Sequence, residues 1–169
     1  AEAQSKALFS RPIVTQTSVI VVDAKRDLHA TRWADLYGWR IGGRLGLSYN
    51  MIANHPEIEL IRSSDDRNNL AKLLRGRLDG FLTGSVSGLL TLAREGYGDQ
   101  VRAIASVDVI PLGLALADET FGAATRARLD GAITRLLDAG ALEDAARRYG
   151  VEALLHPPPL LEDALGAAG

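Results

Sequence analysis

The sequence predicts an α/β fold, with a mostly parallel sheet that is flanked by helices and followed by a C-terminal helical segment. Strand-like and helix-like segments alternate as far as residue 117, which is typical of βα units that share one sheet. Two of these units, around residues 39–53 and 78–95, have the same arrangement of a buried strand, a glycine turn and a helix. From Glu119 onward the pattern is helical only, so this part is expected to pack elsewhere.

The strands are expected where β-branched and apolar residues run together or alternate with polar ones. The clearest is Thr17–Val22, which is rich in valine and isoleucine. The other predicted strands cover residues 39–45, 58–61, 78–83, 101–106 and 109–116.

The helices are expected between these strands and after the last one. Ser64 resembles an N-cap, and Asp65 and Asp66 follow it in the first turn, where the helix dipole favours acidic side chains. Gly140 lies where the end of a helix favours glycine. The predicted helices cover residues 32–37, 49–53, 64–75, 86–95, 119–139 and 142–148, and the prolines at 157–159 predict an extended tail.

The composition excludes several classes of function. Over 169 residues the formal net charge is −2, so no basic surface and no nucleic-acid partner are expected. No stretch approaches the roughly 18 apolar residues that a membrane-spanning helix needs. The chain has no cysteine, which excludes disulfides, cysteine-ligated zinc and thiol catalysis. It begins with Ala1 and shows no signal peptide, so we expect a mature protein or a fragment.

Two glycine turns that carry hydroxyl side chains predict a ligand site. Leu47 and Ser48 follow the strand at 39–45, and Thr83 and Ser85 follow the strand at 78–83. If these strands are parallel neighbours, both turns lie at the edge where open α/β sheets bind ligands. The backbone N–H groups at such helix starts favour a small anion or a polar ligand.

Each candidate ligand-binding residue also has a plain structural interpretation. The hydroxyls of Ser48, Thr83 and Ser85 suit helix capping and turn formation as well as ligand binding. Arg44 reaches an anionic solute in one interpretation and is a solvated strand end in the other. Tyr49 either stacks on a ligand or packs against the protein.

No catalytic or cofactor-binding arrangement is visible in the sequence. His29, His55 and His156 lie far apart, with no carboxylate or histidine at metal-ligand spacing. Ser10 has no partner histidine in a recognisable order. The Gly42-Gly-x-x-Gly46 turn lacks both a dinucleotide-binding fingerprint and a P-loop lysine. We therefore predict no metal, no cofactor and no enzyme activity.

Five short motifs follow one another in an order that is known from one protein family. They are Phe9-Ser-Arg-Pro12, Asp35-Leu-x-Gly-x-x-Ile-Gly42, Gly46-Leu-Ser48, Leu74-x-Gly-Arg-Leu-Asp-Gly80, and Leu136-Leu-Asp-Ala-Gly140 with Arg148-Tyr-Gly150. Together they resemble the type-2 periplasmic binding proteins, in particular the bacterial solute-binding family that delivers polar amino acids to ABC transporters. The resemblance covers residues 7–150 and lacks most of that family's first lobe.

The resemblance implies two lobes that close on a solute by hinge motion. It implies hinges near Pro12 and Thr15 and at Pro111. Its partners would be an inner-membrane ABC permease or a sensor kinase, in the periplasm or another extracytoplasmic place. The implied domains are a hinge lead-in with a remnant of the first lobe (1–16), an α/β ligand-binding lobe (17–111), a return hinge with helices that pack on or complete the first lobe (112–150), and a tail (151–169).

Two departures from the family bear on the ligand. Ala3 stands where the family has an arginine for the ligand carboxylate, and Gly84 stands where it has an aspartate for the ligand ammonium. Because an unpaired buried charge is strongly unfavourable, we expect a small polar solute other than an ordinary α-amino acid. The alternative is a truncated or degenerate binding-protein-like module used for protein interaction or homo-oligomerisation.

Overall fold

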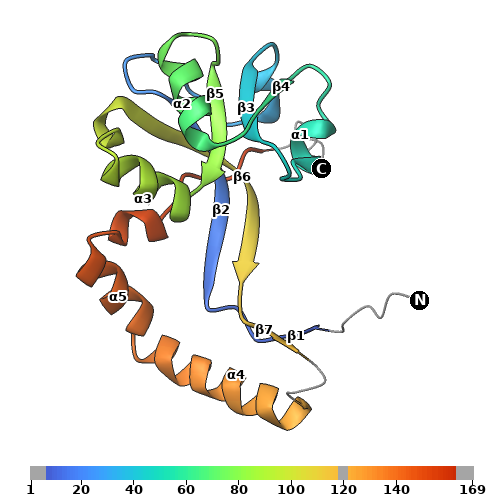
Figure 1. The fold of residues 1–169 in the computed structure, drawn as a ribbon, viewed down its shortest axis with the longest axis vertical. Helices are drawn as coiled ribbons and strands as arrows, with labels where there is room; N and C mark the ends of the chain where they lie inside the picture. Colours follow the sequence, from blue (N-terminus) through green and yellow to red (C-terminus); the bar gives the residue numbers. More distant parts are fainter. Residues whose placement is uncertain (1–6, 118–121, 163–169) are drawn as a thin grey trace, which may run out of the picture. The chain divides into compact units, whose positions relative to one another are not determined.

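The computed structural model describes residues 7–117 and 122–162 (Figure 1). The chain divides into two compact units, one made of residues 1–16 and 110–152, the other of residues 17–109 and 153–169. The division falls within two long strands, β2 (Val14–Asp23) and β6 (Val101–Leu112).

The predicted hinge residues lie close in sequence to this division. Pro12, Thr15 and Pro111 all belong to the first unit. Their role as hinges stays a prediction.

The larger unit contains a five-stranded sheet in the order β4-β3-β5-β2-β6. Strand β3 is parallel to both β4 and β5, as the sequence predicts, whereas β2 runs antiparallel to β5. The sheet is therefore mixed. The sequence did not predict this, because the apolar run of β2 indicates a strand but not its direction. The three parallel strands are β3 (Arg40–Arg44), β4 (Glu59–Ser63) and β5 (Gly80–Gly84).

Helices and loops cover both faces of this sheet, and the alternation along β2 shows how. Val19 and Val21 point into a core that includes Leu70 and Leu73 of α2, whereas Ile20 and Val22 point into a second core with Trp33. The first core lies under α2 (Asp66–Leu74) and α3 (Ser87–Arg94), and the second under the 3-10 helix Trp33–Leu36 and α1 (Asn50–Ala53).

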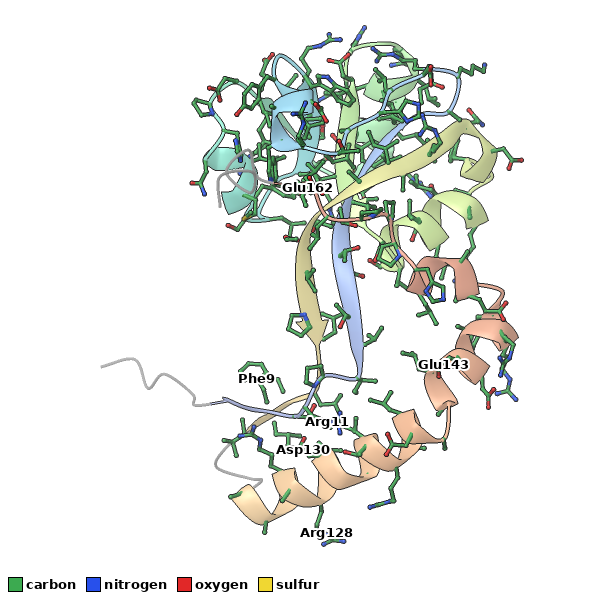
Figure 2. The ribbon with its side chains drawn as sticks, turned by 180° about the vertical axis from the view of Figure 1, so that it is seen from behind. Phe9, Arg11, Arg128, Asp130, Glu143 and Glu162 are labelled. Carbon is green, nitrogen blue, oxygen red and sulfur yellow. The ribbon has the colours of Figure 1, made fainter. Side chains whose placement is uncertain are left out.

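The smaller unit pairs β1 (Ala7–Phe9) antiparallel with β7 (Ala115–Ala117) and adds α4 (Ala123–Asp138) and α5 (Ala141–Tyr149). The backbone N–H of Arg11 donates to the Asp130 carboxylate of α4 at 2.7 Å, and Figure 2 shows the two residues side by side. Gly140 separates the two helices with φ 74°, as its predicted role at the helix end requires.

Two local predictions were wrong. The strands predicted at 101–106 and 109–116 are one long strand, β6, followed by the short β7. The N-cap of α2 is Asp65 and not Ser64, because the Asp65 carboxylate accepts the Asn68 N–H at 2.8 Å. The short helix predicted at 32–37 is present as a 3-10 helix, Trp33–Leu36.

The C-terminal segment returns to the larger unit. A 3-10 helix, Glu152–Leu155, precedes the extended chain at Pro159, whose carbonyl accepts the Ser106 N–H of β6 at 2.8 Å. Another 3-10 helix, Gly98–Gln100, lies directly before β6. Leu161 is buried in the core beside Trp33. Within the described part of the chain, no helix has the length and apolar character to cross a membrane.

Candidate functional site

The C-terminal ends of β3, β4 and β5 lie at one edge of the sheet, since these strands are parallel neighbours. The predicted pairing of the two strands that precede the glycine turns is thus confirmed. The chain continues from this edge into the turn 45–49 after β3, the start of α2 after β4 and the start of α3 after β5. All of these segments belong to the larger unit.

The turn after β3 is exposed and is held by Arg62 of β4. The Arg62 guanidinium donates to the carbonyl oxygens of Arg44 at 3.2 Å and Leu47 at 2.8 Å. It also lies 5.5 Å from the ring centroid of Tyr49, whose hydroxyl accepts the Arg44 N–H at 2.9 Å. Leu47 and Ser48 are exposed, and Tyr49 is the N-cap of α1 in place of Ser48.

The turn after β5 is buried, and both of its hydroxyls are engaged within the protein. The Thr83 hydroxyl donates to the Asp66 carboxylate at 2.7 Å. The Ser85 hydroxyl accepts the Thr17 N–H of β2 at 3.1 Å, and the Ser85 N–H donates to the Thr17 carbonyl at 2.8 Å. The antiparallel neighbour β2 therefore covers this turn.

A hollow of about 370 Å³ opens at the same edge of the sheet, between the end of β3 and the helices α2 and α3. It is lined by Arg44, Asp65, Asp66, Arg67, Ser87, Gly88, Thr91 and Glu95. The wall at Gly88 is tight, because a Cβ at that position would overlap the Thr83 hydroxyl. The hollow thus combines charges of both signs with hydroxyl groups.

Most of the charges around the hollow already have partners. Arg67 donates to the Glu95 carboxylate through Nε at 3.0 Å and Nη2 at 2.6 Å, and this contact lowers the pKa of Glu95. The Asn68 N–H, with help from the Ser64 hydroxyl, lowers the pKa of Asp65. Both carboxylates are therefore ionised at neutral pH.

Two groups at the hollow remain without a full set of partners. One Asp66 oxygen is buried and has no hydrogen bond to any residue that the structure describes. The exposed Arg44 guanidinium makes no ion pair with another described side chain. An acceptor and a cation are thus left at a hollow that has room for a small solute.

The structure gathers the predicted ligand-binding residues only in part. Arg44 lines the hollow, and Leu47, Ser48 and Tyr49 belong to the turn beside it. Thr83 and Ser85 lie on the neighbouring strand end, but their hydroxyls point into the hydrogen bonds given above. The sequence interpretation did not include Asp66, Ser87 and Gly88 among the ligand-binding residues. Asp66 could have been found from its position, because it follows β4 as the two hydroxyl turns follow β3 and β5.

The opposite edge of the sheet carries a structural ion cluster. Asp79, just before β5, accepts from the Arg40 N–H at 3.0 Å and binds the guanidinium groups of Arg40 at 3.2 Å and Arg26 at 3.1 Å. Burial opposes ionisation of Asp79, but the Arg40 N–H and the two arginines outweigh it and lower its pKa. Among the described residues, no group of histidine and acidic side chains has the arrangement of a metal site.

Comparison with known proteins places the fold. No family model and no curated protein matches the sequence. Among solved structures, a mutant of ArgBP from T. maritima matches at 18% identity with a TM-score of 0.64, over 85% of this chain and 62% of that chain. The B. pertussis BvgS periplasmic domain matches at 18% identity with a TM-score of 0.70, over 90% and 29%.

A third structure agrees with these two. It is AbpA from Streptococcus pneumoniae, an amino acid ABC transporter substrate-binding protein bound to L-arginine. It matches at 17% identity with a TM-score of 0.62, over 92% of this chain and 64% of that chain. The fold is that of the type-2 periplasmic binding proteins. The chain spans less than two thirds of the length of the ArgBP mutant and of AbpA.

Proposed function

We propose that the larger unit binds a small polar solute at the C-terminal edge of β3, β4 and β5, without catalysing a reaction. The observation that carries this proposal is the hollow of about 370 Å³ at the ligand-binding edge of an α/β sheet. It brings together Arg44, which makes no ion pair with a described side chain, and an Asp66 oxygen that has no hydrogen bond to a described residue. The binding proteins of the same fold support a binding role.

The residues at this edge would have different roles in binding the solute. Arg44 would contact an anionic or carbonyl group of the solute, and the main chain at Leu47 and Ser48 would donate hydrogen bonds beside it. Thr83 and Ser85 would not make the direct contact with the solute that the sequence suggested. They would instead fix the wall of the hollow by their hydrogen bonds to Asp66 and Thr17. Tyr49 would form the side of the turn.

The likeness to a substrate-binding protein and to a sensor's periplasmic domain supports two settings, both extracytoplasmic. In one, the partner is an inner-membrane ABC permease; in the other, it is a sensor kinase. In both, Pro12, Thr15 and Pro111 would act as hinge residues. Gly84 offers no carboxylate, and the Arg-to-Ala departure at Ala3 lies outside the described residues, so a solute other than an ordinary α-amino acid stays a prediction.

Thermal unfolding with a panel of polar solutes tests this function. The panel would include L-arginine, which is bound in AbpA, together with amines, carboxylic acids and amides that are not α-amino acids. A solute present at 100 times its Kd adds about 2.7 kcal/mol to the stability of the folded state and raises Tm. Titration calorimetry would then give the Kd.

The variant Arg44→Ala should weaken binding of the responding solute about tenfold, because a hydrogen bond to a charged group is lost. Arg77→Ala is the matched control, since Arg77 is an exposed arginine of the same unit away from the hollow. A panel without any Tm shift, or equal binding by Arg44→Ala and wild type, would contradict the proposal.

A second candidate function rests on the surface of the smaller unit. Phe9 is 61% exposed, Leu114 45% and Leu136 59%, and such apolar surface favours association. The chain would then serve as an interaction or oligomerisation module. Sedimentation that shows a dimer indifferent to solutes would favour this function, and a monomer that binds a solute would oppose it.

A further inference from the structure

Three residues hold the exposed turn after β3. They are Gly43, Tyr49 and Arg62, and we call them the turn clamp. Gly43 and Arg62 are register partners on the parallel strands β3 and β4, so their side-chain positions are neighbours on one face of the sheet. The clamp therefore joins the turn to a strand that follows it in the sequence.

The absence of a side chain at Gly43 makes room for the Tyr49 ring. A Cβ at Gly43 would lie 2.7 Å from Cε2 of Tyr49, a distance that forces the ring to move. The ring occupies this space, and its hydroxyl accepts the Arg44 N–H at the end of β3. The ring thus packs against Gly43 through Cε2 and Cδ2, and the hydrogen bond fixes its hydroxyl.

Arg62 completes the clamp from the other strand. Its guanidinium donates to the carbonyl oxygens of Arg44 and Leu47, which flank the turn, and lies over the Tyr49 ring. The turn is held further by the Leu45 N–H, which donates to the Ser63 carbonyl at 2.8 Å. Both hydrogen bonds come from Nη1, while the planar guanidinium lies over the ring. Lysine has no planar group to stack on the ring while it donates, so it is not an equivalent replacement.

We propose that Arg62 is a positioning residue for solute binding, although it does not line the hollow. By fixing the carbonyl groups of Arg44 and Leu47 it holds the 45–49 turn in one conformation, so that the Arg44 side chain and the turn's main chain meet a solute without first being ordered. A preordered turn raises affinity because the entropy of ordering is not lost on binding. This inference rests on the proposed function.

Hydrogen exchange tests the clamp without any ligand. In Arg62→Ala, the amides of residues 45–49 should exchange about tenfold faster than in the wild type, while the amides of β2 and α2 keep their rates. Tyr49→Phe, which loses the acceptor of the Arg44 N–H, and Gly43→Ala, which displaces the ring, should speed exchange in the same segment. Unchanged exchange in Arg62→Ala would overturn the proposal.

Binding of L-arginine and of the other panel solutes tests the consequence for affinity. Arg62→Ala and Arg62→Lys should both raise Kd about tenfold, and the Arg77→Lys control should leave it unchanged. Faster exchange with an unchanged Kd would overturn the positioning role. If the wild type binds no solute of the panel, the proposed function fails, and the binding role of Arg62 with it, whereas the exchange rates still decide whether Arg62 orders the turn.

Discussion

The turns after β3 and β5 come from similar sequences and end in opposite environments. Both follow a short parallel strand, and both combine glycine with a hydroxyl residue. The first is exposed and held by Arg62 from outside, whereas the second is buried under β2, with Ser85 only 1% exposed. The comparison shows that the neighbouring strand, and not the turn sequence, decides whether a turn meets solvent or the protein interior.

The largest effect is expected where α3 closes on the buried turn. Gly88→Ala places a Cβ on the Thr83 hydroxyl and should lower the free energy of unfolding by about 3 kcal/mol, as overpacking does. Gly131→Ala in α4 is the control, because its Cβ would meet only Arg135 at 3.6 Å and should add about 0.5–1 kcal/mol. Urea unfolding measures both, and equal effects would refute the close packing at Gly88.

A pair of serine variants compares the two turns directly. Ser85→Ala leaves the buried Thr17 N–H without its side-chain acceptor and should cost about 2 kcal/mol. Ser48→Ala, on the exposed turn, should change stability by less than about 0.5 kcal/mol. The same unfolding measurement applies, and a greater loss in Ser48→Ala would reverse the assignment of buried and exposed turn.

A buried residue of α2, which packs on β3 and β5, offers a stabilising substitution. Asn69 of α2 is fully buried next to Gly42 of β3, where an added Cβ would lie 2.8 Å from the Asn69 side-chain oxygen. Its amide has no hydrogen bond to a described residue. Asn69→Leu keeps the shape and removes the unsatisfied polar atoms, so Tm should rise by an amount that corresponds to about 1 kcal/mol. A fall in Tm would show that this amide has a partner that the contacts above do not include.

The smallest effect is expected in the response to acid. Asp65 and Glu95, which line the hollow, have pKa values lower in the folded protein than the ordinary 3.8 and 4.5. Their contribution to stability is therefore complete above these ordinary values and is lost as the pH falls through the lower folded values. The contacts of Arg62 and Tyr49 involve no carboxylate.

Amide chemical shifts followed from about pH 5 into the acid range measure this difference, because ordinary carboxylates titrate near about pH 4 and lowered ones at more acidic pH. The amides of residues 65–68 and 95 should titrate below the ordinary carboxylate range, while those of 45–49 change little. If the amides of 45–49 titrate together with those of 65–68 and 95, the turn after β3 is not held independently of these carboxylates.

The elements themselves could be predicted from local patterns. Hydrophobic runs and alternation located β2, β3, β4 and β5, and the spacing of Leu70 and Leu73 located α2. Local patterns did not predict that residues 101–112 form one strand, because Val107 and Asp108 do not interrupt a ladder whose partner is distant in the sequence. They also misplaced the N-cap of α2, since Ser64 and Asp65 are both good caps and only the backbone geometry chooses between them.

The candidate site was predictable at the level of the sheet edge and less so at the level of atoms. Parallel strands end at one edge by construction, so the positions of Arg44 and Ser48 followed from the strand pattern. The direction of β2 did not, and it is β2 that takes the Ser85 hydroxyl out of reach. The contact between Arg62 and the Leu47 carbonyl joins β4 to the turn after β3, and no local motif records it.

The sequence by itself determined the α/β class, the order of strands and helices and the glycine turns, because these depend on side-chain periodicity and on backbone freedom within a few residues. Only the tertiary structure decided which turn is exposed to solvent, which hydroxyls are hydrogen-bonded within the protein and which charged groups line the hollow. These properties depend on contacts between segments far apart in the chain, where direction, register and burial are settled together.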